Sequence, residues 1–555
     1  MITEKDYVTY SDFGAIGDGV ANDFEAMLLT HEYANEHHLS VKGESDKQYR
    51  IHTTEKDGEA RSIIIKTHTD WCGATIIIDD TDIEHKAGNS DYKNPIIKIL
   101  PYEETISLSE EIIATLPKIT RETKKLDLGL GYPAMVVLYN DEVRHYIRHG
   151  SCANNGSPQH ELFILDKDGN IDPSTPFMYD YDKVTHIDVI KTEIEPLVVE
   201  NGIFRQRASH IDTVKILPDG TRKNMNRAYF HRNIEISRSN TTVRKIEHYI
   251  SGEITIEEQA RGMYGPAYRG FLAAISANNV TIEDCVLTAR RNYAPGTYAF
   301  SASLSNNVVL RRCTQSNYYK KDENGNPTKV LSTEVHPLTK RPEYWGIGGS
   351  GFCKNMVYDS CKVTRYDAHQ GLCNGRITNC HISMINLVGA GEMIIENTTI
   401  ESAGSTIANL RRDYGSTWNG VIRIKNCTVD FNEEVSQKKA LRVFNFGWVN
   451  HFFGYICHFP SIEIDNLKFT RPELSPVQMI MFKNTMDYES PETETNIHLP
   501  TLADGTKNEN PTVPPKFFRV INNEQGLEYA LPDVPFFENT ELEGIKKVPP
   551  FSLVH

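Results

Sequence analysis

The side chains best suited to proton transfer in this 555-residue sequence lie in its second half. The stretch RYDAHQG contains Asp367 and His369, and a carboxylate near an imidazole can move protons in acid–base catalysis. We expect both residues to share one outer face with further polar and aromatic residues: Arg290, Arg291, Tyr293, Tyr318, Tyr319 and Arg365. A solvated face rarely combines these residue types, which indicates a functional surface. A network of polar turn contacts is the structural alternative.

Two further stretches carry candidate binding residues. NLRRDYGSTWNG places Arg411, Arg412, Asp413, Tyr414 and Trp418 on one excursion between predicted strands. PEYWGIGGSG contributes Tyr344 and Trp345, whose rings offer flat faces to a ring-shaped ligand if they are exposed. The alternative is that Trp345 and Trp418 both belong to the core. The glycines of PEYWGIGGSG predict tight turns, because a phosphate-binding loop requires a following Gly-Lys-Ser/Thr and a helix.

A short repeat must position these residues. From about residue 229 the chain repeats one theme of alternating apolar and polar residues that ends in Cys or a substitute, as in NNVTIEDCVLT, NNVVLRRCTQS and KNMVYDSCKVT. Such alternation predicts short strands with one buried face. The last position of the theme, here called the anchor, recurs at intervals of 18 to 48 residues: Ile246, Cys285, Cys313, Cys361, Cys380, Thr398, Cys427 and Leu467.

Strands without intervening helices predict a parallel β-helix, in which each coil lies about 4.8 Å above the last. We expect the five anchor cysteines to stack as an inward-facing ladder of free thiols, since buried Cys behaves as a small hydrophobe. A zinc site is the alternative for four closely spaced residues: His369, Cys373, Cys380 and His381. Because Cys380 belongs to the ladder, we predict neither a metal nor any other cofactor.

The beginning of the chain, DFGAIGDGVANDFEAMLL, gathers acids and glycines ahead of an apolar helical pattern. It resembles the opening of the pectate-lyase-like right-handed β-helix superfamily, which includes polygalacturonase-type glycosidases, polysaccharide lyases and phage tailspikes. The matching residues are Asp12, Phe13, Gly14, Ala15, Gly17, Asp18, Gly19 and Asp23. The resemblance implies a groove along one outer face that binds sugar chains, with catalytic residues on neighbouring coils. It does not specify the reaction.

The same stretch has a structural interpretation. The first coil of a solenoid exposes an apolar end that a cap must cover, and a helix from about Phe24 to Ala34 can be that cap, with Asn22 or Asp23 at its N-terminus. We therefore predict an all-β fold, a single right-handed parallel β-helix with an N-terminal capping helix and a β-rich insertion. The predicted parts are the cap and first coils over 1–100, the insertion over 101–228, the main β-helix with its groove over 229–470, and a Pro-rich tail over 471–555.

On this fold Asp367 and Asp413 are candidates for a catalytic carboxylate pair. Their anchors are two coils apart, an axial offset of about 10 Å, and inverting glycosidases need carboxyls roughly 6.5–9.5 Å apart. Glu392, on the coil between, is a fallback partner. We predict glycoside hydrolysis in which Asp367 and Asp413 share the acid and base roles and His369 tunes Asp367. Arginines at 291, 365 and 411 would hold a charged or hydroxyl-rich sugar.

Two other functions remain open. DAHQ at 367–370 is similar to the Asp-x-His of β-helix uronate epimerases, so His369 as base, a tyrosine as acid and an arginine on the uronate carboxylate would give a lyase or epimerase. A non-catalytic glycan-binding or tailspike protein would lack an acid–base pair in the groove. Most polygalacturonase motifs are missing, and RIK at 423–425 lies inside a repeat strand.

Composition excludes other classes. The net charge of −15 argues against a nucleic-acid partner, because phosphate binding relies on clustered Lys and Arg. The sequence contains no apolar run of about 18 residues, so we expect no membrane span, and the N-terminus lacks a secretory signal pattern, so we expect a cytoplasmic protein. Ten cysteines in 555 residues do not form a disulfide-dense pattern. The expected partner is a poly- or oligosaccharide, and the sequence does not indicate an oligomeric state.

Overall fold

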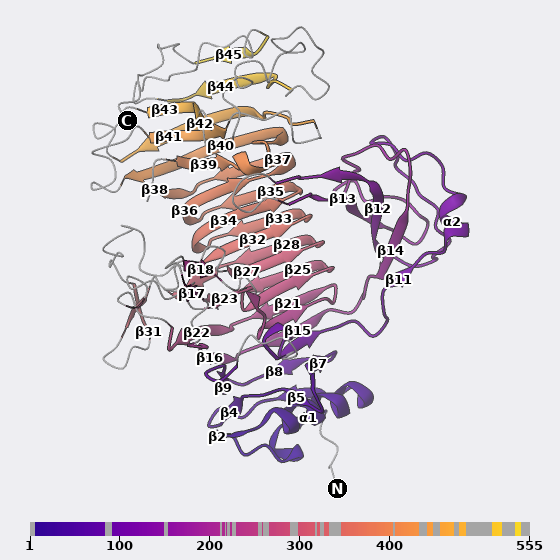
Figure 1. The fold of residues 1–555 in the computed structure, drawn as a ribbon, viewed down its shortest axis with the longest axis vertical. Helices are drawn as coiled ribbons and strands as arrows, with labels where there is room; N and C mark the ends of the chain where they lie inside the picture. The colour runs from indigo at the N-terminus through magenta and orange to yellow at the C-terminus, as the bar shows by residue number, and fades with distance from the viewer. Residues whose placement is uncertain are drawn as a thin grey trace. The chain divides into compact units, whose positions relative to one another are not determined.

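Figure 1 shows the fold of the chain as a computed structural model. The structure describes residues 6–83, 91–148, 154–210, 214–216, 218, 222–224, 229–253, 258, 266–288, 298–316, 319–321, 327–331, 346–402, 406–431, 441–447, 456–470, 477–483, 513–523 and 539–544. Within these residues no helix has the length and apolar character needed to cross a membrane.

Most of the described strands belong to one large sheet, and its strands pair in parallel. The chain forms two compact units. The first comprises Met1–Glu104, Thr192–Gly349 and Cys361–Thr364, and the second comprises Thr105–Lys191, Ser350–Ser360 and Arg365–His555. The two strands β32 (Ile347–Gly351) and β34 (Lys362–Gln370) are divided between them.

The first unit is a stack of short parallel strands. Its contributions to the large sheet are β1 (Tyr7–Thr9), β2 (Asp18–Asn22), β3 (Ser40–Lys42), β4 (Gln48–Ile51), β7 (Ile63–Ile65), β8 (Thr69–Asp70), β9 (Thr75–Asp79), β10 (Ile97–Ile99), β15 (Leu197–Glu200), β16 (Ile203–Arg207), β20 (Ile234–Ile236), β21 (Thr241–Arg244), β22 (Glu247–Ser251), β24 (Leu272–Ile275), β25 (Asn278–Glu283), β26 (Val286–Leu287), β27 (Tyr298–Ser303), β28 (Asn306–Arg311) and β29 (Thr314–Gln315). Short two-stranded pairs join β5 (Glu55–Lys56) with β6 (Glu59–Ala60), β17 (Val214–Ile216) with β18 (Arg222–Asn224), β19 (Tyr229–Phe230) with β23 (Ala267–Tyr268), and β30 (Tyr319–Lys321) with β31 (Pro327–Leu331). The 3-10 turn η2 spans Asp91–Lys93.

The acids of the opening motif organise turns rather than a catalytic site. After the 3-10 turn η1 (Ser11–Phe13), the Asp18 carboxylate accepts the N–H groups of Val20 and Ala21 at 2.8 and 2.9 Å. Asp23 occupies the N-cap position of α1 (Phe24–His37), yet its carboxylate accepts the N–H of Ile16 at 2.8 Å instead of capping the helix. The helix packs on β1, β3 and β7, as the predicted cap should.

The second unit also contains a stack of parallel strands (Figure 1). Its strands are β33 (Lys354–Asp359), β35 (Leu372–Thr378), β36 (His381–Leu387), β37 (Gly389–Glu396), β38 (Thr399–Ser402), β39 (Thr406–Leu410), β40 (Trp418–Phe431), β41 (Leu441–Gly447), β42 (Ser461–Phe469), β43 (Val477–Lys483), β44 (Phe517–Ile521) and β45 (Glu541–Glu543). The register aligns buried side chains of successive coils: Tyr358, Ile377, Ile395, Ile424, Ile464 and Val520. This column of apolar side chains is part of the core of the coils in this unit.

The anchor cysteines are buried, as the repeat predicts, and each follows a corner of its coil. The residue before the anchor has a positive φ, as at Asn379 (55°) and Asn426 (52°), a conformation that Asn adopts more readily than most residues. The thiol then contacts a carbonyl of the preceding coil, with Cys380 Sγ 3.5 Å from the oxygen of Tyr358 and Cys427 Sγ 3.4 Å from that of Ile395. All nine described cysteines are free.

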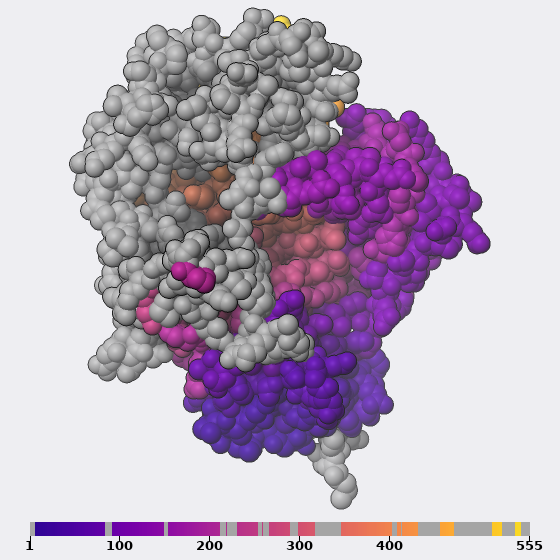
Figure 2. All heavy atoms as spheres, in the orientation of Figure 1, coloured from indigo at the N-terminus to yellow at the C-terminus, as the bar shows by residue number. Residues whose placement is uncertain are grey.

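An antiparallel insertion belongs to the second unit. Four strands pair in the order β11 (Ile106–Ser107), β14 (His186–Lys191), β12 (Ala134–His145) and β13 (Ser157–Leu165), next to the short helix α2 (Glu110–Ala114). Their apolar faces enclose a separate core that includes Val136, Phe163 and Val189. The insertion is the violet lobe in Figure 2.

The predicted fold class, an all-β right-handed parallel β-helix with a capping helix and a β-rich insertion, is confirmed. The predicted part boundaries differ from the strand pairing in two places. β15 and β16 pair in parallel with β8 and β9, so residues 197–207 belong to the β-helix and not to the insertion predicted over 101–228. β43, β44 and β45 continue the parallel sheet inside the segment predicted as a tail.

Candidate functional site

Six of the predicted site residues meet on one side of the second unit. Asp367 and His369 lie on β34, and the chain that leaves β39 carries Arg411 followed by the 3-10 turn η4 (Arg412–Tyr414). β36 pairs with both β34 and β39, so the two segments are two coils apart, as the anchors predict. The turn is closed by the N–H groups of Tyr414 and Ser416, which donate to the Arg411 carbonyl at 3.1 and 3.0 Å.

The guanidinium of Arg411 joins the two predicted carboxylates. Its Nε and Nη2 donate to Asp413 at 3.1 and 2.7 Å, and its Nη1 lies 3.9 Å from Asp367 Oδ1. Arg365 Nη2 donates to the other oxygen of Asp367 at 2.5 Å. The space between Asp367 and Asp413 is therefore occupied by an arginine side chain, not left open to water.

Both carboxylates are held in the ionised state. Burial by itself raises the pKa of Asp367, whose side chain is 1% exposed, but Arg365 leads a set of neighbours that hold this pKa well below its usual range. Burial also raises the pKa of Asp413. The charges and hydrogen bonds of Arg411 and Arg148 more than offset this effect, so the pKa of Asp413 is lowered as well. Neither group is arranged as a carboxylic acid that could donate a proton near neutral pH.

His369 is held neutral. Arg411 Nη1 donates to its Nδ1 at 2.6 Å, and because a guanidinium cannot accept a hydrogen bond, the ring proton must be on Nε2. This Nε2 lies 3.2 Å from the hydroxyl of Tyr414. Burial and the charge of Arg411 lower the pKa of His369, and together they outweigh the opposing effect of Asp367, whose Oδ2 lies 3.7 Å from Nδ1. Burial raises the pKa of Tyr414, so the pair consists of a neutral imidazole and a neutral phenol.

The sequence-based prediction did not include Arg148. This residue belongs to the insertion, and its Nε donates to Asp413 Oδ2 at 2.7 Å across a sequence separation of 265 residues. Its guanidinium carbon lies 5.4 Å from the centre of the Tyr414 ring. Neither a motif nor a repeat position connects residue 148 to the coil face, so the only signal in the sequence was the arginine itself in RHYIRHG.

Asn386 on β36 was also missed. With its carboxamide oxygen turned toward Arg365, it accepts hydrogen bonds from Nη2 and Nε of that residue at 2.5 and 3.0 Å. It lies on the coil between Asp367 and Asp413, and Asn409 on β39 pairs with it in register. An Asn at the centre of a strand is a detectable polar signal, because Asn is depleted in strands.

Two predicted residues are positioned for other roles. Trp418 is fully buried and its indole N–H donates to the Gly391 carbonyl at 3.1 Å, so it is a core residue and not a substrate-binding one. Glu392 is exposed and pairs with Arg423 at 2.7 Å, and Arg423 also pairs with Glu463. Glu392 thus belongs to a surface ion-pair chain along successive coils. Arg423, in the RIK stretch, has a structural partner on each side.

Several predicted binding residues cannot be placed. Arg291, Tyr293, Tyr344 and Trp345, together with Arg290 and Tyr318, lie outside the described residues. Tyr319 begins β30 in the first unit and Arg412 begins η4, but only their backbones are described. Their roles stay predictions.

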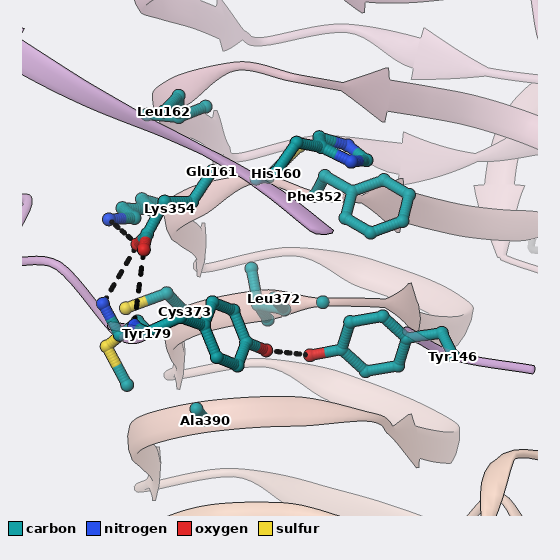
Figure 3. A pocket seen from close by; sticks show the side chains of 13 residues that line it. Tyr146, His160, Glu161, Leu162, Tyr179, Phe352, Lys354, Leu372, Cys373 and Ala390 are labelled. Carbon is teal, nitrogen blue, oxygen red and sulfur yellow. Dashed lines mark hydrogen bonds and ion pairs between the residues drawn. The ribbon is translucent and has the colours of Figure 1, made fainter. Parts of the chain in front are cut away.

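A small cavity lies where the insertion meets β33, β35 and β37 (Figure 3). Its volume of about 20 Å³ suits one water molecule. Glu161 on β13 and Lys354 on β33 form an ion pair in its wall at 2.9 Å, with side chains 5% and 3% exposed. Tyr146 and Tyr179 share a hydrogen bond of 2.8 Å there. This cavity is part of the packing that holds the insertion to the coils and has no room for a sugar.

The described residues contain no group of three or more His, Cys, Asp and Glu placed to hold a metal ion. Of the four residues considered for zinc, Cys380 Sγ faces the coil interior, whereas His369 belongs to the Arg411 cluster and His381 pairs with Glu401 at 3.1 Å. Cys373 lines the small cavity. The four side chains therefore have separate surroundings.

Neither a protein-family model nor a curated protein sequence matches the chain. Among solved structures it is similar to the tailspike protein gp49 from Pseudomonas phage LKA1, with 10% identity, a TM-score of 0.48 and coverage of 96% of this chain and 84% of that one. It is similar to an exopolygalacturonase from Thermotoga maritima at 10% identity and a TM-score of 0.30, with coverages of 87% and 93%. The A-module of the mannuronan C-5 epimerase AlgE4 from Azotobacter vinelandii has 9% identity and a TM-score of 0.31, with coverages of 99% and 98%. Likenesses at these TM-scores do not assign a reaction.

Proposed function

We propose that the chain is a carbohydrate-active enzyme that acts on an anionic poly- or oligosaccharide by proton transfer, as a lyase or epimerase does. The resemblance of the opening motif supports a sugar substrate. One observation carries the reaction type: His369 and Tyr414 are neutral and hydrogen-bonded to each other, while arginines hold both nearby aspartates ionised. The neutral pair can exchange a proton with a substrate near neutral pH.

The charge of the cluster favours an anionic substrate. Arg148, Arg365 and Arg411 face two aspartates and a neutral imidazole, which leaves one excess positive charge. When a base removes the proton from the carbon next to a sugar carboxylate, negative charge builds up on that carboxylate in the transition state. A fixed guanidinium stabilises such charge. The excess charge is local, because the whole chain carries −15.

Within this proposal His369 is the base and Tyr414 its partner. The side chain of His369 is 27% exposed, more than that of Asp367, Asp413 or Arg411. To accept a proton, its Nδ1 must release the hydrogen bond from Arg411, and a bound carboxylate would draw the Arg411 Nη1 toward itself. Once Nδ1 holds the substrate proton, the Nε2 proton passes to the Tyr414 oxygen while Tyr414 gives its own hydroxyl proton to the substrate. That proton goes to the leaving oxygen in a lyase, or to the opposite face of the same carbon in an epimerase.

Glycoside hydrolysis is the second candidate, and one observation favours it. Asp367 and Asp413 lie on either side of the Arg411 guanidinium, so two carboxyls flank one site, as the carboxyl pair of an inverting glycosidase flanks a water. Hydrolysis also needs one carboxyl to be protonated. Substrate binding would therefore have to displace an arginine from Asp367 or Asp413.

Product analysis tests the proposal. Wild-type protein is incubated with oligomers of galacturonate, mannuronate and glucuronate, and the products are followed by ultraviolet absorbance, reducing ends and sugar composition. We expect an unsaturated or epimerised uronate, lost in His369→Asn and Tyr414→Phe variants whose melting temperatures match wild type. New reducing ends without unsaturation or epimerisation, sensitive to Asp413→Asn, would replace the proposal with hydrolysis. Binding without any product would indicate a non-catalytic glycan-binding protein.

A further inference from the structure

The insertion delivers Arg148 to the candidate site in a fixed position. The backbone of Arg148 forms a two-way bridge with Asn154, with N–H to O distances of 3.1 and 2.9 Å. Two residues earlier, the buried Tyr146 packs with Val388 and Tyr414, and its hydroxyl bonds that of Tyr179 at 2.8 Å. The backbone of Arg148 and the nearby side chain of Tyr146 are therefore both fixed. This limits the conformational entropy that Arg148 loses when it binds a ligand.

Arg148 uses only one edge of its guanidinium. Nε donates to Asp413 Oδ2, and no described residue accepts a hydrogen bond from Nη1 or Nη2. Arg411, by contrast, uses all three nitrogens, on Asp413 and His369. The side chain of Arg148 is 21% exposed. Of these two arginines, only Arg148 has a pair of donors without an acceptor among the described residues.

We infer that Arg148 is a specificity-determining residue that receives a carboxylate of the sugar on its Nη1 and Nη2. Two parallel N–H donors match the two oxygens of a carboxylate, which is the geometry of bidentate arginine recognition. Asp413 orients the guanidinium from its other edge, and the Tyr414 ring supports its face. The substrate carboxylate then lies within the cluster that contains His369.

This inference rests on the proposed function, since it assumes an anionic sugar at this site. It goes further by assigning carboxylate recognition to the insertion, so that removal of a single insertion side chain should abolish discrimination between charged and neutral sugars. A purely structural ion pair with Asp413 would affect both kinds of sugar alike. The two roles therefore predict different binding data.

The test compares binding of uronate oligomers and of their carboxyl-reduced, neutral counterparts by calorimetry, using the full chain. We expect wild type to prefer the uronate, and Arg148→Ala to weaken uronate binding by about tenfold to a hundredfold, the range that hydrogen bonds to charged groups cover. Arg148→Lys keeps the charge but loses the paired donors, and should weaken uronate binding by about tenfold. Binding of the neutral oligomer should stay within about twofold in both variants, because it presents no charged group to the guanidinium.

Arg144→Ala is the matched control, because Arg144 is an exposed residue near the end of β12 in the same insertion. It should bind both oligomers as wild type does. A preference for uronate that persists in Arg148→Ala overturns the inference and leaves the proposed function standing. A wild-type protein that binds neither oligomer, or both equally, contradicts the proposed function itself and the inference with it. Melting temperatures of all variants show whether each is folded.

Discussion

Lys354 offers a sharp test of how the insertion is held to the coils. Its Nζ lies 2.9 Å from Glu161 Oε2, and the two side chains are 3% and 5% exposed. Glu161 also accepts the N–H groups of Met178 and Tyr179 at 2.9 and 3.2 Å. Lys354→Met leaves a buried carboxylate with these two backbone donors alone. We expect the free energy of unfolding to fall by about 3–5 kcal/mol, the cost of breaking a buried pair.

A second change should recover part of that loss. Glu161→Gln in the Lys354→Met background removes the unpaired charge and keeps an oxygen for one of the two backbone N–H groups, which bond different oxygens of Glu161. The double variant should therefore be more stable than Lys354→Met alone. The control is Lys183→Met, because Lys183 and Glu142 form an ion pair whose side chains are 56% and 61% exposed. Its loss should cost less than about 1 kcal/mol.

Urea denaturation followed by circular dichroism measures these differences, and activity at a temperature where all variants are folded measures their effect on the site. Because the insertion carries Arg148, we expect Lys354→Met to lower activity as well as stability. A Lys354→Met variant no less stable than Lys183→Met would refute the reasoning. So would a double variant less stable than the single one.

Three further changes have defined outcomes. Burial lowers the pKa of His31 in α1 to about 3, so the unfolded state binds the proton more tightly and stability is lost as pH falls from about 6.5 toward 3, by at most about 5 kcal/mol; His31→Phe should flatten the melting temperature over this range. The folded pKa of Asp367 is lowered, so its stabilising contribution is complete above about pH 4 and is lost as pH falls through the folded pKa. Asp367→Asn should therefore melt below wild type at pH 7, and the gap should close in acid. A Cβ at Gly420 would lie 2.0 Å from the Gly391 carbonyl oxygen, so Gly420→Ala should cost about 1–3 kcal/mol in urea denaturation.

The repeat made much of the fold predictable. Alternating residues determine which face of a strand is buried, and the anchor cysteines, such as Cys380 and Cys427, mark the corner of each coil. The same register placed Asp367 and Asp413 two coils apart, where the structure brings them to the Arg411 guanidinium. Local periodicity was sufficient to predict this placement, because coils that follow one another in the sequence also contact each other in space.

Other features depend on contacts that no local pattern encodes. Arg148 reaches Asp413 because the insertion packs on the coils, through contacts that include the Glu161–Lys354 ion pair and the packing of Tyr146 against Val388. Trp418 begins β40 and is a core residue, which is the alternative to substrate binding that the sequence left open. The ionisation of the two aspartates also depended on which arginines lie beside them, and a list of residue types does not contain that information.

The central claim, that His369 and Tyr414 transfer a proton to or from an anionic sugar, is tested most directly by following the hydrogen on the carbon next to the sugar carboxylate. Uronate oligomers are incubated with wild type and His369→Asn in deuterated water and observed by proton NMR. The account predicts that wild type exchanges this hydrogen for deuterium or removes it with formation of a double bond, and that His369→Asn does neither. Cleaved oligomers that retain this hydrogen would contradict the claim.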